Sequence, residues 1–71
     1  MTYPGESERP HRQAELVRLE AELRQLLIAI VWAQRAGQPR QVATLRREEA
    51  RRRRRIAHLR ALLGLPADEE G

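Results

Sequence analysis

Apolar residues recur in alternating steps of three and four along the first half of the chain, from residue 16 to residue 33. This spacing places them on one face of an α-helix, as in a coiled coil, and predicts a long amphipathic helix over about residues 9–36. We expect it to begin between residues 7 and 11, because Ser7 can cap a helix and Pro10 is tolerated in a first turn. The seam residues of this helix are Leu16, Leu19, Leu23, Leu26, Ile30 and Ala33.

A strong stop signal follows the first predicted helix, in the segment Ala36-Gly37-Gln38-Pro39. Gly37 suits the left-handed residue that closes a helix, and Pro39 suits the first turn of the next one. We therefore place a turn at residues 37–38. So short a connection between two helices predicts that they run antiparallel.

The second helix is predicted at about residues 39–63, where Gly64 ends it. The chain is thus expected to be all-α, with an antiparallel two-helix hairpin over residues 9–64. A flexible leader is expected at residues 1–8 and a disordered acidic tail at residues 65–71. The seam of the second helix consists of Val42, Leu45, Glu49, Arg52, Ile56, Leu59 and Leu63.

The two seams do not match in the middle of the hairpin. With this turn, residues whose numbers sum to about 75 lie opposite one another, so Leu26 faces Glu49 and Leu23 faces Arg52. Two leucines opposite two charged residues cannot form a dry core, because isolated buried charge is costly.

Two arrangements of this middle layer are open at this point. Glu49 and Arg52 are three apart on one face of the helix, so they could pair with each other and lay their apolar stems over the leucines. Alternatively, the helix rotates so that Ala50 and Arg53 share the layer, which leaves the leucines for another chain.

The stretch from residue 26 to residue 33 is apolar on every side of the first helix. Such a helix is expected to be buried all round, which a single hairpin cannot achieve. We therefore predict a homodimer, with two hairpins packed as a four-helix bundle. A docking groove for a different protein is the alternative, and a membrane-surface role is disfavoured because the apolar and arginine-rich runs lie on different helices. The predicted interface residues are Leu23, Leu26, Leu27, Ile30, Val31 and Trp32.

Charge is distributed unevenly along the chain. All fourteen basic residues are arginine, the formal net charge is +4, and residues 40–60 alone hold nine arginines and two glutamates. Arg46, Arg53 and Arg60 repeat every seven residues, which predicts an outward stripe about 21 Å long on the second helix. Such a stripe could follow several phosphates with little sequence preference. The candidate phosphate-binding residues are Arg46, Arg47, Arg51, Arg53, Arg54 and Arg60.

The same arginines also fit a purely structural role. Arg52 and Arg53 each follow a glutamate by four residues, and each such pair stabilises a helix by about 0.2–0.5 kcal/mol. In the hairpin the first helix would bring further carboxylates to the run, from Glu15, Glu20 and Glu22. A solvated, ion-paired face and a phosphate-binding face both remain open.

Little in the sequence indicates catalysis. The chain has no cysteine, its only imidazoles are His11 and His58, and no hydroxyl nucleophile lies beside a base in the sequence. We therefore expect no enzyme activity, no metal and no cofactor. The polar N-terminal sequence does not resemble a secretory signal, and the apolar run is shorter than the roughly 20 residues that span a bilayer. A cytoplasmic protein is expected.

These features predict a small non-enzymatic interaction or adaptor protein. It would self-associate through the apolar face of the first helix and present the arginine-rich second helix. The alternative is a small nucleic-acid-binding protein that contacts DNA or RNA phosphates through the arginine stripe.

Overall fold

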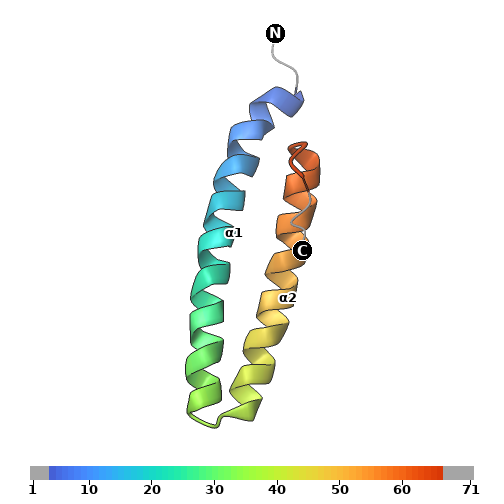
Figure 1. The fold of residues 1–71 in the computed structure, drawn as a ribbon. Coiled ribbons are helices and arrows are strands. Elements are labelled where there is room, and N and C mark those ends of the chain that lie inside the picture. Colours follow the sequence, from blue (N-terminus) through green and yellow to red (C-terminus); the bar gives the residue numbers. More distant parts are fainter. Residues whose placement is uncertain (1–3, 67–71) are drawn as a thin grey trace.

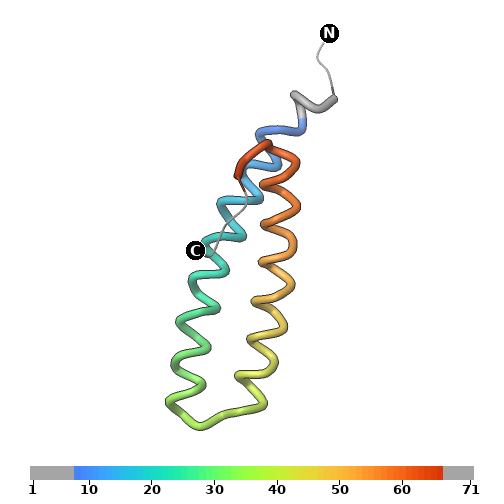
Figure 2. Tube along the Cα trace, turned by 45° about the vertical axis from the view of Figure 1, so that its right-hand side comes forward, coloured from blue at the N-terminus to red at the C-terminus, as the bar shows by residue number. Residues whose placement is uncertain are grey.

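The structure is a computed structural model that describes the backbone of residues 4–66 and the side chains of residues 8–66. The described part contains two α-helices, α1 (Pro4–Arg35) and α2 (Pro39–Leu62), joined by a tight turn. The helices run side by side in opposite directions (Figure 1), and a view turned by 45° shows the same arrangement (Figure 2). The predicted all-α antiparallel hairpin is confirmed.

Helix α1 begins at Pro4, earlier than the start expected between residues 7 and 11. Proline suits the first position of a helix, because its ring presets the backbone angle and its missing N–H has no partner there. Ser7 is consequently not the cap, and Pro10 lies inside the helix, where it removes one backbone hydrogen bond. Residues 4–8 of the expected leader are therefore helical, whereas residues 67–71 of the expected tail lie outside the described residues.

Both helices end in the same way, at a glycine with a positive φ. Gly37 has φ +67°, and the N–H of Gln38 donates to the carbonyl of Ala33 at 3.0 Å. Gly64 has φ +72°, and the N–H of Leu65 donates to the carbonyl of Arg60 at 2.8 Å. These are Schellman motifs, which satisfy the last carbonyls of each helix, and they explain why both predicted stops are confirmed.

The apolar core lies mainly toward the open end of the hairpin. Helix α1 supplies Leu16 and Leu19, and α2 supplies Ile56, Leu59 and Leu63. Leu59 is fully buried. A second buried group, Ile30 and Ala33, lies beside the turn. The packing of residues 16 and 19 against residues 56 and 59 agrees with the predicted register.

The middle layer follows the first of the two arrangements considered, with one correction. The side chains of Glu49 and Arg52 are only 14% and 27% exposed, whereas Ala50 is exposed. Helix α2 has therefore not rotated. The two side chains do not pair with each other, however, because each finds a different partner.

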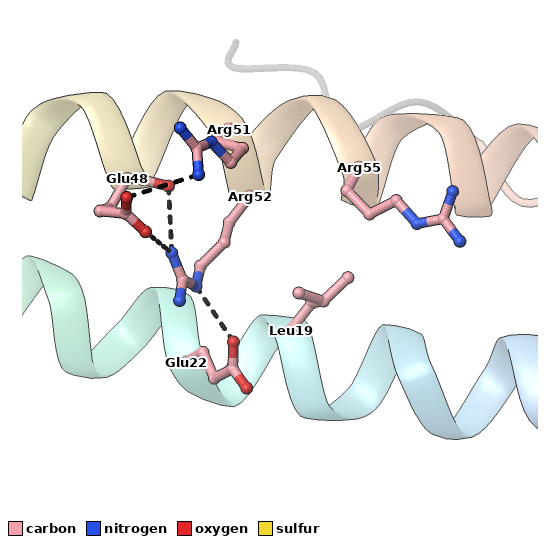
Figure 3. A pocket seen from close by; sticks show the side chains of 6 residues that line it. All are labelled: Leu19, Glu22, Glu48, Arg51, Arg52 and Arg55. Atoms are coloured by element: carbon pink, nitrogen blue, oxygen red, sulfur yellow. Dashed lines mark hydrogen bonds and ion pairs between the residues drawn. The ribbon is translucent and has the colours of Figure 1, made fainter.

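Arg52 connects the two helices across this layer (Figure 3). Its Nε donates to Glu22 Oε1 of α1 at 3.0 Å, and its Nη1 donates to Glu48 Oε1 of α2 at 2.7 Å. Glu49 instead accepts from Arg53 Nε at 2.9 Å. Charged side chains thus occupy the seam with their hydrogen bonds satisfied, while their apolar stems leave the leucines opposite them half-buried.

Arg52→Ala is expected to lower the Tm by about 4–8 °C, a shift that corresponds to about 1 kcal/mol in a domain of this size. The substitution removes both short ion pairs and leaves Glu22 and Glu48 with only the 3.7 Å contacts to Arg18 and Arg51. Thermal unfolding followed by circular dichroism measures this shift.

Arg54→Ala is the matched control, because it makes the same change on an exposed face of the same helix. Its Tm should stay within about 3 °C of the parent protein. Equal shifts for the two variants would contradict the role assigned to Arg52.

Candidate functional site: an apolar face on α1 and an arginine face on α2

Helix α1 carries exposed apolar side chains on the side turned away from α2. We call them the apolar face: Leu27, Ile28, Val31 and Trp32, with Val17 farther along the helix. Ile28 is 52% exposed and Trp32 is 64% exposed. A contiguous apolar patch of this kind on a small protein is a typical interaction surface.

The structure places the predicted interface residues in three different positions. Leu27, Val31 and Trp32 belong to the apolar face. Leu23 and Leu26 are half-buried beneath the charged layer. Ile30 is only 4% exposed, so it lies in the hairpin core and not on the surface. The reason is its seam position, which points at α2.

Val17 and Ile28 belong to the apolar face but are not among the predicted interface residues. Ile28 lies three residues before Val31 and four before Trp32, so all three share one side of the helix. The second apolar series of the sequence, beyond the seam positions, already contains both Val17 and Ile28.

Two arginines border the apolar face. The guanidinium of Arg35 lies over the Trp32 ring, with 5.9 Å from its Cζ to the ring centroid, which makes a cation–π contact. Arg24 lies one turn before Ile28 and is exposed. Among the residues that the structure describes, neither arginine has a carboxylate within ion-pair distance. The apolar face is thus framed by positive charge.

Helix α2 divides its arginines between two sides. Arg55 donates to Glu15 at 3.0 and 3.1 Å, and the 23% exposed Arg60 reaches Glu20 at 3.4 Å. Arg53 is paired with Glu49, and Arg46 lies 3.7 Å from the same carboxylate. Arg53 and Arg60, which the seven-residue spacing predicts on an outward stripe, thus take part in ion pairs of the hairpin, and Arg60 is half-buried.

The outward side of α2 carries the remaining arginines, and we call Arg40, Arg47, Arg51 and Arg54 the arginine face. Arg51 has one long contact, 3.7 Å from Glu48. The other three have no carboxylate within ion-pair distance in the described part of the chain. Arg47 donates only to the Thr44 hydroxyl, at 3.4 Å.

A groove of about 380 Å³ lies between the helices on the side of the Arg52 contacts (Figure 3). Glutamates from both helices face the three arginines of its lining, Glu22 from α1 and Glu48 from α2. The hydrogen bond from Arg55 lowers the pKa of Glu15, and the hydrogen bond from Arg52 lowers the pKa of Glu48. Arg52 and Arg55 thus bridge α1 and α2. The groove is lined by Leu19, Glu22, Glu48, Arg51, Arg52 and Arg55.

Comparisons with protein-family models, curated proteins and solved structures found no match to this chain. Neither of the helices in the described part is long and apolar enough to cross a membrane. Within residues 8–66, no three histidine or acidic side chains gather as metal ligands would. The two faces are therefore assessed by their chemistry alone.

The lowered pKa values of Glu15 and Glu48 predict a loss of stability in acid. Both carboxyls bind protons less readily in the folded chain than in the unfolded chain, so their contribution is present above the ordinary value of 4.5 and is lost as the pH falls through the lowered values. The Tm should be constant between about pH 7 and 5 and should fall toward about pH 3.

Glu15→Gln, Arg55→Gln and the double variant isolate one of these pairs. All three should lose less Tm in acid than the parent protein, because each substitution removes the hydrogen bond from Arg55 that is the largest cause of the lowered pKa of Glu15. An acid dependence in Glu15→Gln equal to that of the parent protein would exclude this ion pair as a cause.

Proposed function

We propose that this chain is a small non-enzymatic interaction protein that self-associates through the apolar face of α1. Two hairpins would pack as a four-helix bundle, with the α1 helices inside and the arginine-rich α2 helices outside. The observation that carries this proposal is the apolar face itself, which includes the chain's single tryptophan. Aromatic anchors of this kind are enriched at the centres of protein interfaces.

The exposed area of the chain supports a second copy as the occupant. The chain exposes 5760 Å², whereas a compact monomer of 8.3 kDa exposes roughly 4600 Å². The difference exceeds the roughly 800 Å² that each partner buries in a stable interface. The radius of gyration, 15.3 Å against about 11 Å for a compact chain of this length, points the same way.

The double variant Ile28→Glu/Val31→Glu should convert a dimer into a folded monomer. Both side chains are exposed in the hairpin, so glutamate is tolerated there but cannot be buried at an interface. Light scattering should give twice the 8.3 kDa mass for the parent protein and the single mass for the variant. Trp32 emission should shift to the blue as the parent protein is concentrated.

Ala43→Glu/Ala50→Glu is the matched control, since it adds the same charge to the exposed side of α2. It should remain a dimer. A parent protein of single mass at every concentration would contradict self-association and would leave a different protein as the partner of this face.

A further inference from the structure

Residues 40–60 consist of three consecutive seven-residue repeats. Each repeat has the form Arg-x-x-Ala-x-x-Arg, and together they fill α2 from its first turn to its last. Seven residues are nearly two turns of an α-helix, so equivalent residues of successive repeats share one side. The repeats read RQVATLR, REEARRR and RRIAHLR.

The structure separates the two arginines of each repeat. The last ones, Arg46, Arg53 and Arg60, flank the seam and contact glutamates of α1 or α2. The first ones, Arg40 and its equivalents Arg47 and Arg54, are exposed on the outward side. In the described residues these three have no carboxylate partner. The last arginine of each repeat thus has a glutamate partner within the hairpin, whereas the first arginine has none among the described residues.

The alanines of the repeats lie beside these arginines. Ala43, Ala50 and Ala57 are all exposed, and each follows the first arginine of its repeat by three residues. Alanine side chains are short, so an extended ligand can come close to the backbone of α2 along this row. The large exposed apolar side chains of the described chain lie on α1 or at the end of α2, so this surface has no apolar anchor for a protein or for a lipid.

The arginines form an extended row of positive charge, which suits a chain of phosphodiester groups. Successive arginines of the row are about 10.5 Å apart, and the row is about 21 Å long. Arg51 lies between Arg47 and Arg54, at four and three residues from them, so the like charges repel in the free protein. A guanidinium offers several donors in one plane, which match the oxygens of a phosphate.

We propose that the arginine face binds the phosphodiester backbone of nucleic acid, with Arg40, Arg47 and Arg54 as the principal contacts and Arg51 beside them. Recognition is through charge and is independent of base sequence. DNA and RNA share this chemistry. Binding at this face does not require self-association, because the apolar face lies on the other helix.

Fluorescence anisotropy with labelled nucleic acid of mixed sequence tests the proposal, with duplex DNA, duplex RNA and single-stranded DNA as separate arms. Affinity for at least one of them should fall as salt rises, with a slope of about −2 to −4 for log K against log salt. No binding by any of the three at low salt would overturn the proposal. Competition by polyglutamate as effective as that by unlabelled nucleic acid would also overturn it, since it would show that any polyanion suffices.

Arg47→Gln/Arg54→Gln and Arg46→Gln/Arg53→Gln form a matched pair of variants. Each removes two arginines that lie seven residues apart on α2, so the net charge is the same. The first variant should weaken binding by roughly tenfold or more and reduce the salt slope by about 2, whereas the second should change binding much less. Equal losses would overturn the assignment to the outward row.

Circular dichroism checks that each variant is folded under the conditions of the binding measurement. Arg46 and Arg53 belong to ion pairs, so their variant is compared below its own Tm. The same two pairs of arginine substitutions are also made in the Ile28→Glu/Val31→Glu variant. There too, Arg47→Gln/Arg54→Gln should weaken binding more than Arg46→Gln/Arg53→Gln does. Loss of that difference in this variant would count against binding by the arginine face of a single hairpin.

Discussion

A pair of helices can bury only one side of each helix against the other, and most features of this protein follow from that limit. The contact between α1 and α2 accommodates a narrow row of apolar side chains, with Leu59 at its most buried point. Even this row is interrupted, because Glu49 and Arg52 occupy seam positions. The Arg52 bridge to Glu22 keeps that interruption from leaving an unpaired charge between the helices. The remaining sides of both helices are left to solvent or to a partner.

The local signals of the sequence were sufficient for most of the fold. Steps of three and four residues located both helices, and Gly37 and Gly64 adopt the left-handed conformations that their positions suggested. The start of α1 was not predictable to the residue, because Pro4, Ser7 and Pro10 each suit a helix N-terminus. The partners of Glu49 and Arg52 were also beyond the sequence. Several carboxylates lie within reach of each arginine, and the choice among them depends on side-chain geometry that only the packed hairpin determines.

The candidate surfaces were predictable in kind but not residue by residue. Five consecutive arginines, residues 51–55, look like one patch in the sequence, yet a helix turns by about 100° per residue and distributes them around its axis. Arg52 and Arg55 reach α1, Arg53 reaches Glu49, and only Arg51 and Arg54 remain on the arginine face. Ile30 is both a seam residue and a predicted interface residue, and its burial against α2 shows that the seam position decides its place.

The two proposed interactions use opposite sides of the hairpin and therefore do not compete. Helix α1 lies between its partner helix and the apolar face, so burial of that face leaves every residue of the arginine face exposed. A two-fold bundle would carry two such faces, one on each α2, pointing away from each other. Two separated phosphate-binding rows on one rigid body suit the joining of two nucleic-acid segments better than tighter binding to one, because a single straight segment cannot contact both sides at once.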